Sequence, residues 1–436
     1  MTRTLIIWLV VAGSAYAQDL DQAQVDLAIE KGVKALKRRN ADHLRPIQFG
    51  GRPMQYCELV AFTYLHADVP ESDPDLKALI DDMLERDLMA TYCVSLQAMV
   101  LEELDRVKHQ KRILKCAKFL VDNQTATGFW GYGTPSAYLE DVAYDVVKRK
   151  DVASAGGVTK PFELPIPGLR TKPRVVNKVR VKKERDGQPG DNSNTQYAAL
   201  GLRACHDAGI LLEEKVIDLA MKWLRDAQKN EKEPAEDLVE GGTAGPENGG
   251  RPGVAGGTSG GTGGRQTFVK RRAAPQGWCY GDHDNHKAYG SMTAGAVGSL
   301  AIWDYIKDND DGKRRSWKND PDVHEGLVWL SKNFSVTYNP GPYEHGNPGF
   351  EENSPYSYFY YMYALERAGM LYGTEVLGKH KWYPEGAKEL IASQRPDGNW
   401  GGGTADTCFA ILFLKRATRS LGVATYSAGQ MREGKK

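Results

Sequence analysis

Four acidic residues lie close to the predicted beginnings of helices, where carboxylates from different segments could face a common substrate. Asp191 and Asp406 stand at two such beginnings, and Glu351 and Glu352 precede a third. A glycosidase needs two carboxylates that flank the scissile bond at a defined separation. The sequence gives no distances, so a polysaccharide lyase or hydrolase remains one alternative, and the catalytic residues remain unknown.

A second polar group is the segment Asp282-His283-Asp284-Asn285-His286, which lies in a predicted loop. Imidazole and carboxylate side chains can bind metal ions, but we interpret this segment as a solvated loop. We keep Asp282 and Asp284 as weak candidates for catalysis, together with Asp191 and Asp406. We predict no metal and no cofactor.

An aromatic group follows on one face of a predicted helix, formed by Tyr356, Tyr360 and Tyr363 with Phe359 beside them. Aromatic faces stabilise cations, and they also stack on sugar rings. If these rings line a cavity, they predict a site for an apolar or a glycan ligand. The alternative is ordinary core packing, in which buried hydroxyls still need hydrogen-bond partners.

Two kinds of helical segment alternate along the chain and would position these groups. The first kind is amphipathic, with charges on one face: 24–39, 75–88, 111–123, 213–228, 323–333 and 384–394. The second kind is apolar or small nearly all round: 56–66, 92–104, 195–206, 292–306, 356–368 and 407–416. Half-polar helices belong outside and uniformly apolar helices inside. We therefore predict an all-α fold, an (α/α)6 toroid of six outer and six inner helices, with the beginnings of the inner helices on one face.

Two inserts interrupt this alternation. Residues 125–191 contain an alternating segment, 175–181, that predicts a strand of a small β-hairpin. Residues 230–272 contain a loop from Gly241 to Gly264 whose Gly, Thr and Ser content predicts disorder. Because both can be surface insertions, we predict a single domain over residues 18–420, followed by a disordered tail, 421–436.

A repeated unit joins outer to inner segments. Gln124 is followed by Gly128-Phe129-Trp130, and Gln394 is followed by Gly398-Asn399-Trp400. Gln228 and Trp278 complete a third unit if residues 230–272 are removed. One helix pair cannot bury its apolar face alone, so recurring pairs of this kind indicate a repeat architecture.

This Gln-x-x-x-Gly-x-Trp unit resembles the QW repeat of the terpenoid cyclase and protein prenyltransferase toroids. The resemblance in helix pattern covers nearly the whole chain, but the specific motif covers only the turns. It implies that Gln124, Trp130, Trp278, Gln394 and Trp400 are structural, with each Trp between outer helices and each Gln holding helix ends. It also implies an isoprenoid enzyme as a second functional alternative.

Two family motifs are only partly present. Protonation-initiated cyclases carry an Asp-x-Asp-Asp motif at the beginning of an inner helix, whereas the corresponding segments here, 191–195 and 403–407, lack paired carboxylates. Protein prenyltransferases bind zinc through an Asp-x-Cys pair, which Asp406-Thr407-Cys408 resembles. No histidine begins the next inner segment, Gln55-Tyr56-Cys57, so we interpret Asp406 as an N-terminal cap.

Composition limits the possible partners. The 436 residues carry a formal net charge of +1, which argues against nucleic acid as a main partner. The six cysteines form no CxxC pair, and most lie in apolar helical patterns, so we interpret them as buried thiols. After the N-terminal run, no segment is apolar for long enough to span a bilayer stably.

The N-terminal residues resemble an export signal. Arg3 precedes an apolar run from Leu5 to Gly13, and Ala15-Tyr16-Ala17 follows. This order is typical of a cleaved signal peptide, here residues 1–17, and predicts a periplasmic or extracellular location. The leading interpretation is thus an exported toroid with a central cavity that binds a ligand or partner, and whether it is an enzyme stays open.

Overall fold

The computed structural model describes residues 20–49, 52–135, 145–147, 172–173, 175–229, 232–243, 266–281, 287–311, 317–341, 357–419 and 421. Over this part the chain is predominantly helical with a few short strands, which confirms the predicted helical class. The predicted segments and the observed helices agree in order, and most agree in length, but the helix predicted over 292–306 extends from Gly290 to Asp311. The signal-peptide residues, the tail beyond 421 and the segment 282–286 lie outside the described residues.

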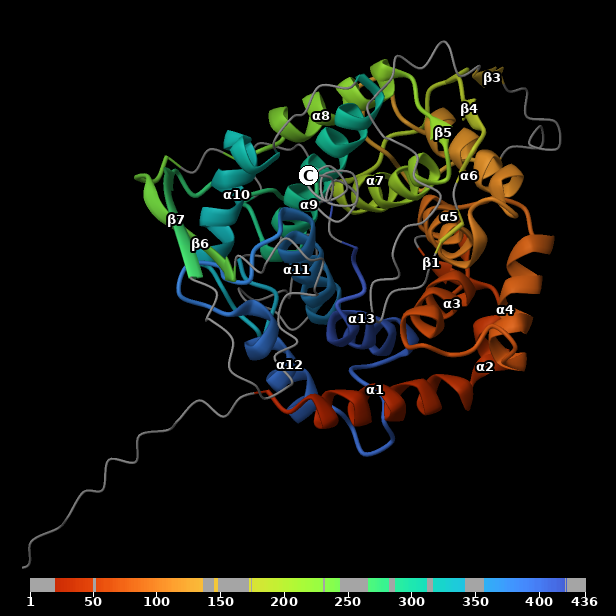
Figure 1. Cartoon of the computed structure of the whole chain (residues 1–436), viewed down its shortest axis with the longest axis horizontal. Helices are drawn as coiled ribbons and strands as arrows, with labels where there is room; N and C mark the ends of the chain where they lie inside the picture. Colours follow the sequence, from red (N-terminus) through yellow and green to blue (C-terminus); the bar gives the residue numbers. More distant parts are fainter. Residues whose placement is uncertain are drawn as a thin grey trace, which may run out of the picture.

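Six amphipathic helices lie on the outside of the molecule (Figure 1). They are α1 (Gln22–Lys37), α4 (Pro74–Glu85), α6 (Gln110–Asp122), α8 (Glu214–Asp226), α10 (Pro321–Lys332) and α12 (Trp382–Ser393). In α8 the buried residues include Val216, Ala220 and Leu224, spaced one helical turn apart, so one face is apolar. Two of these helices begin with Asp-Pro: Asp73 and Asp320 each accept two backbone N–H bonds at the first turn of α4 and α10.

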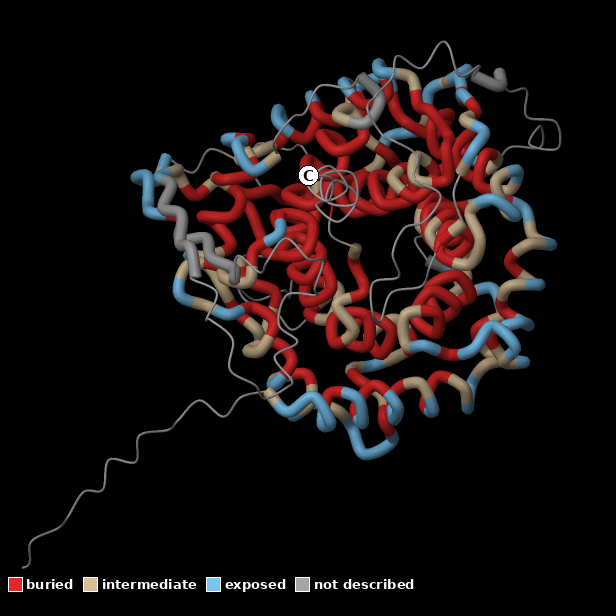
Figure 2. The backbone as a smooth tube through the Cα atoms, viewed as in Figure 1, coloured by how far each residue is buried: buried red, intermediate tan, exposed pale blue. Residues whose placement is uncertain are grey.

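Six further helices lie nearer the centre and are buried over most of their length (Figure 2). They are α3 (Cys57–His66), α5 (Thr91–Asp105), α7 (Asn192–Asp207), α9 (Gly290–Asp311), α11 (Tyr358–Tyr372) and α13 (Thr404–Lys415). Each contacts the next in this order, and α13 contacts α3, so the contacts close on themselves. Each outer helix packs on at least one inner helix, and α1 contacts both α12 and α13. The short helix α2 (Asn40–His43) and the hairpin of β1 (Ile47–Phe49) and β2 (Arg52–Met54) connect α1 to α3.

The predicted strand near residues 175–181 is more integrated than a free hairpin. Strand β4 (Lys178–Arg180) pairs antiparallel with β3 (Asp145–Val147) and parallel with β5 (Ile210–Leu211), which directly follows α7. Val179 and Val181 are buried. The alternation along residues 175–181 therefore reflects a strand whose one face is buried against the helices.

The glycine-rich loop is shorter than predicted. Gly241 to Thr243 belong to β6 (Glu236–Thr243), which pairs antiparallel with β7 (Gln266–Ala273), so the prediction of disorder from residue 241 is wrong for these three residues. Backbone pairing with 266–268 orders them, and sequence composition does not report such pairing. Residues 244–265 lie outside the described part.

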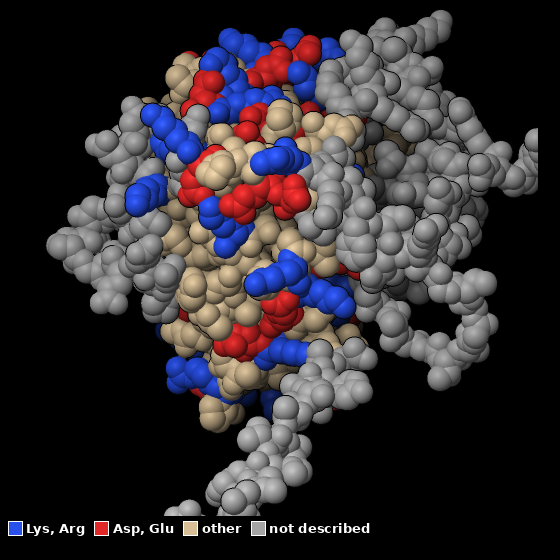
Figure 3. All heavy atoms as spheres, turned by 90° about the vertical axis from the view of Figure 1, so that its left-hand side faces the viewer, with Lys and Arg blue, Asp and Glu red and all other residues tan. Residues whose placement is uncertain are grey.

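The described surface shows no large region of one charge on the side drawn in Figure 3, where acidic and basic side chains are interspersed. Among the described helices, none has both the length and the apolar character needed to cross a bilayer. The six cysteines are free thiols, and five of them are buried.

Candidate functional site

The three Trp turns connect outer to inner helices through the same set of bonds. The indole Nε1–H groups of Trp130, Trp278 and Trp400 donate to a leucine carbonyl of the preceding outer helix at 2.7, 2.6 and 2.7 Å. Their backbone N–H groups donate to a threonine hydroxyl of the following inner helix at 3.1, 3.0 and 3.1 Å. All three rings are fully buried. Each turn therefore fixes the beginning of one inner helix relative to its outer partner.

Trp278 and Trp400 also pack on the next outer helix, where a glycine leaves room for each of them. A Cβ atom at Gly32 of α1 would lie 2.7 Å from a ring carbon of Trp400, and one at Gly326 of α10 would lie 2.8 Å from Trp278. A side chain at either glycine would clash with the indole. The rings thus lie between neighbouring outer helices.

The glutamines of the repeat hold the same junctions. Gln124 Nε2 donates to Val216 O of α8 at 2.8 Å, Gln228 Nε2 to Asp322 O of α10 at 2.9 Å, and Gln394 Nε2 to Ala28 O of α1 at 2.9 Å. Gln124 and Gln394 donate in addition to the carbonyl of Gly128 and Gly398 in their own turns. The bond from Gln394 to Ala28 joins the last outer helix, α12, to the first outer helix, α1.

Asp191 lies at the beginning of α7, between two of these turns. Its carboxylate accepts bonds from the backbone N–H and side-chain amide of Asn194, both at 2.8 Å. The Asp191 N–H donates to Trp130 O at 3.0 Å, and the next N–H donates to Tyr280 O at 2.9 Å. Burial raises the pKa of Asp191, whereas bonds from Asn194 and the Tyr280 hydroxyl act in the opposite direction. These contacts make Asp191 the cap of α7 and place Tyr280 beside it.

A hydrogen-bonded chain joins the beginnings of three inner helices. Tyr92 of α5 donates to Ser193 Oγ of α7 at 2.6 Å, and Ser193 Oγ lies 2.8 Å from the hydroxyl of Tyr360 of α11. Tyr360 donates in turn to Gln196 Oε1 at 3.1 Å. We call Tyr92, Asp191, Ser193, Gln196, Tyr280 and Tyr360 the rim cluster. Three members of the rim cluster are only partly buried: Tyr92, Tyr280 and Tyr360. The hydrogen-bonded chain therefore leads from the centre toward the surface.

A buried arginine lies deeper along α11. The Arg367 guanidinium lies over the ring of Tyr363, 4.3 Å from its centroid, and farther from the rings of Tyr197 and Tyr360, at 5.7 and 5.9 Å. Tyr363 stacks in turn on Phe409 of α13, with the ring centroids 5.8 Å apart. Cation–π contacts of this kind are strong where the charge is removed from water. The space between the inner helices at this level therefore holds aromatic side chains around the Arg367 guanidinium.

Asp406 and Cys408 do not form a zinc site with the described residues around them. The Asp406 carboxylate accepts a bond from Gly402 N–H at 2.9 Å, and burial raises its pKa. Burial also raises the pKa of the Cys408 thiol to about 12, which opposes the thiolate that zinc requires. In the described part of the chain, no group of three or more His, Cys, Asp or Glu residues is arranged to hold a metal ion.

The remaining predicted residues are placed as follows. Phe359 is half-buried beside Tyr358, with ring centroids 4.8 Å apart. Tyr360 and Tyr363 belong to the central aromatic group, whereas Tyr356, Asp282 and Asp284 lie outside the described residues. Asp191 caps α7, whereas Asp406 lies in the first turn of α13 and Gly403 stands at the cap without a side-chain bond, so the prediction of Asp406 as the cap is wrong. Helices α7 and α13 are three places apart in the cycle of inner-helix contacts. The structure therefore brings Tyr360, but not Asp406, into contact with the first turn of α7.

Sequence analysis missed Tyr92, Tyr280, Ser193, Gln196 and Arg367. A signal was present, because Tyr92 follows the residue that begins α5 much as Tyr360 follows the beginning of α11. Aligning the beginnings of α5 and α11 would have identified these two tyrosines. The hydrogen-bond partners of these tyrosines lie on other inner helices, and local sequence patterns do not show which helices pack together.

The rim cluster is suited to binding more than to proton abstraction. Burial holds the pKa of the Tyr92 hydroxyl well above its usual range and raises the pKa of Tyr360, so both hydroxyls are neutral at physiological pH. A neutral hydroxyl donates and accepts hydrogen bonds but is a poor general base. Comparison of the chain with protein-family models and with curated protein sequences finds no match, so its function must be inferred from this geometry.

Proposed function

We propose that the chain forms one (α/α)6 toroid domain and acts as an exported binding protein for a glycan-like ligand. The toroid is supported by the closed cycle of contacts from α3 through α13 back to α3. The bond from Gln394 to Ala28 of α1 supports closure of the outer layer as well. The ligand site is the rim cluster, at the beginnings of α5, α7 and α11.

The observation that carries the glycan assignment is the hydroxyl chain of Tyr92, Ser193 and Tyr360. It combines partly exposed aromatic rings with hydroxyl groups that both donate and accept. Sugars present apolar ring faces and hydroxyl edges together, so they complement such a surface. An isoprenoid chain could contact the aromatic rings, but it offers no hydrogen-bonding groups to the hydroxyls.

Export is proposed on the order of charged, apolar and small residues in 1–17, which lie outside the described part. An extracellular location fits a glycan ligand, because polysaccharides surround many cells. N-terminal sequencing of the protein recovered from its natural source tests this point. A mature chain that begins near Gln18 supports export, and a chain that begins at Met1 contradicts it.

A glycan array tests the binding proposal. The full mature chain should bind a defined subset of glycans, and Tyr360→Ala should abolish that binding because it removes both the ring and the hydroxyl at the junction of α7 and α11. Tyr358→Phe is the matched control, because its hydroxyl donates to Val336 O, outside the rim cluster. Squalene and farnesol serve as competing probes. Binding of these lipids without any glycan would favour the isoprenoid alternative and overturn the proposal.

A further inference from the structure

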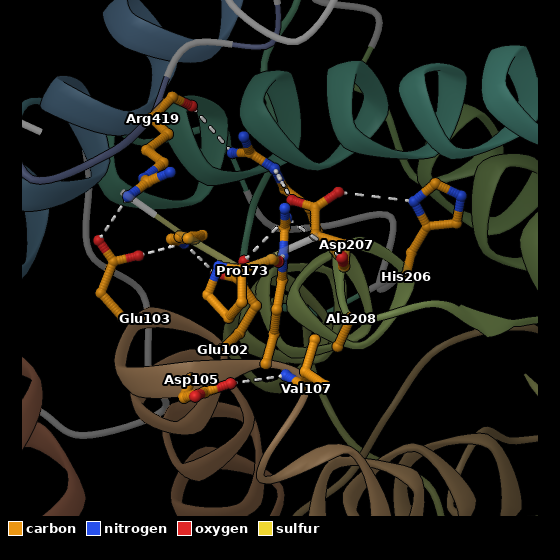
Figure 4. Close-up of polar contacts among 12 residues, drawn as sticks. Glu102, Glu103, Asp105, Val107, Pro173, His206, Asp207, Ala208 and Arg419 are labelled. Atoms are coloured by element: carbon orange, nitrogen blue, oxygen red, sulfur yellow. Dashed lines mark hydrogen bonds and ion pairs between the residues drawn. The ribbon is translucent and has the colours of Figure 1, made fainter. Parts of the chain in front are cut away.

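The two ends of the inner helices differ in how far their polar groups satisfy one another. Opposite the rim cluster, a pocket of about 60 Å³ is lined mainly by the C-terminal halves of α3, α5 and α7 and by residues 417–419 (Figure 4). We call it the charged pocket. Its carboxylates pair with its own cations: Glu103 accepts from Arg419 at 3.0 Å, and Asp207 pairs with Arg203 at 3.7 Å. These charges are used within the protein, whereas the rim cluster ends in a hydroxyl that still accepts.

The orientation of the Gln196 side chain is fixed by two neighbours that can each play only one role. The Arg367 guanidinium has no acceptor, and its Nη2 lies 3.4 Å from Gln196 Oε1. The Ser291 carbonyl has no hydrogen to donate, and it lies 3.4 Å from Gln196 Nε2. Exchanging the oxygen and nitrogen of this amide would set donor against donor and acceptor against acceptor. Gln196 Oε1 is therefore an acceptor toward α11.

This orientation sets the direction of every hydrogen bond in the chain of hydroxyls. Tyr360 lies 3.1 Å from Gln196 Oε1 and donates its single hydrogen to it. Ser193 then has to donate to Tyr360, at 2.8 Å, because the hydrogen of Tyr360 is already used. Ser193 also has only one hydrogen, so Tyr92 donates to Ser193, at 2.6 Å. The hydrogens therefore all point inward, from Tyr92 to Gln196.

The outer end of the chain consequently presents an acceptor. Tyr92 gives its only hydrogen to Ser193, and no described residue donates a hydrogen bond to the Tyr92 oxygen. A hydroxyl that has donated still accepts through its lone pairs. Tyr92 is partly exposed, and its ring packs edge-on against the ring of Tyr197, with the centroids 4.8 Å apart. A ligand at Tyr92 thus has to supply the hydrogen.

The charges on either side of this chain balance one another. Burial, followed by the charge of the Asp191 carboxylate, raises the pKa of Tyr92, so this carboxylate acts on the oxygen at the outer end. The Arg367 guanidinium carries the opposite charge and lies 5.9 Å from the centroid of the Tyr360 ring. Asp191 opposes an anion beside Tyr92, and Arg367 offsets the attraction that Asp191 would exert on a cation. The two charges together favour a ligand without net charge.

We propose that the rim cluster selects an uncharged sugar unit through a free hydroxyl group that donates to the Tyr92 oxygen. This inference rests on the proposed glycan site and adds the direction of its hydrogen bonds. An O-methylated sugar keeps the oxygen but has no hydrogen to donate, so it cannot form the bond to Tyr92. Gln196 is a positioning residue, because it sets the direction of the chain through Tyr360 and Ser193.

A glycan array tests the proposal on the full chain when it carries each neutral oligosaccharide beside its per-O-methylated form, together with acidic oligosaccharides. The free neutral forms should bind at least about tenfold more tightly than their methylated forms. Tyr92→Phe should weaken binding of the free forms about five- to tenfold, the effect of one hydrogen bond. Tyr361→Phe is the matched control, because its hydroxyl donates to Ser335 O at 3.1 Å, outside the rim cluster, and it should leave binding unchanged.

Two variants of Gln196 test the direction of the chain. Gln196→Met removes the acceptor, so the hydroxyls of Tyr360 and Ser193 can turn and Tyr92 can donate to a ligand. The preference for free over methylated oligosaccharides should then fall at least about threefold. Gln196→Glu keeps an oxygen acceptor beside Arg367 and should retain the preference. The same preference in both variants would contradict the positioning role, and if Gln196→Met does not fold, Tyr92→Phe decides the proposal.

The outcomes separate this inference from the proposed function. Equal affinity for free and methylated forms, or binding of acidic oligosaccharides alone, would overturn the inference while a glycan site remains. Unchanged binding in Tyr92→Phe would overturn it as well. Absence of binding to any oligosaccharide would overturn the inference and the proposed function together.

Discussion

Single residues in this chain fix the helices relative to one another, and the three repeated tryptophans are an example. Trp130, Trp278 and Trp400 each join an outer helix to its inner partner through the indole and the backbone N–H group. Trp278 and Trp400 also pack against the next outer helix, so a change at either should disturb three helices together. The rim cluster and the pocket depend on these junctions, because the junctions fix where the inner helices begin and end.

Trp400→Ala should lower the free energy of unfolding by about 3–5 kcal/mol, the usual cost of removing a buried aromatic side chain. The ring is fully buried and donates to Leu390 O at 2.7 Å. Urea denaturation measures the effect, with the half-buried Trp317 changed to Ala as a control that should cost less. Equal losses in the two variants would contradict the junction role.

The buried Glu366 should make stability depend on pH. Burial raises its pKa from 4.5 to about 7 in the folded protein, so the folded state binds this proton more tightly than the unfolded state does. Its contribution is fully present below about pH 4.5 and is lost as the pH rises through about 7, on the order of 3 kcal/mol in total. Glu366→Gln should remove this slope from the pH profile of unfolding. Glu214→Gln is the control, because Glu214 is exposed, and this variant should keep the pH dependence of unfolding.

At the scale of helices and strands, sequence pattern predicted the elements well and their partners poorly. The twelve segments found by apolar periodicity correspond to twelve helices, because that periodicity directly reflects which face is buried. The parallel pairing of Val179 with Ile210 was missed, since β5 is only two residues long. The hydrogen bonds from Tyr92 to Ser193 and between Ser193 and Tyr360 were missed. They join residues more than 100 positions apart, and these residues meet only because α5, α7 and α11 pack together.

Replacing the repeat glutamines should lower the free energy of unfolding by amounts that depend on how deeply each is buried. Gln124 is fully buried, whereas Gln394 is half-buried and water can replace part of its bonding. Gln124→Ala should therefore cost about 2 kcal/mol or more and Gln394→Ala about 1 kcal/mol, because buried carbonyls left without a donor are the more costly. Thermal and chemical denaturation of both variants measure the difference. A larger loss in Gln394→Ala would contradict this ranking.

The segment between β6 and β7 should be dispensable. Thr243 pairs directly with Gln266, so an Asn-Gly turn can replace residues 244–265 without changing the register of the hairpin. The segment is rich in Gly and Thr and carries few apolar residues to bury. The deletion variant should melt within about 2 °C of the full chain. A fall of many degrees would show that the segment packs on the rest of the molecule.

At the scale of the whole molecule, the two ends of the inner helices have different chemistry. One end presents the hydroxyl-rich rim cluster, and the other presents the charged pocket, with the aromatic group around Arg367 between them. We therefore expect the glycan to bind at the rim cluster and not at the charged pocket.

Hydrogen–deuterium exchange of the full chain, with and without a glycan selected on the array, tests the central claim most directly. Bound ligand should slow exchange at the first turns of α5, α7 and α11 and leave the last turns of α3, α5 and α7 unchanged, because protection reports local stabilisation by the contacts formed. Protection confined to the first turns of α5, α7 and α11 is the result that the account predicts. Protection only at the last turns, or only in the outer helices, would contradict a ligand site at the rim cluster.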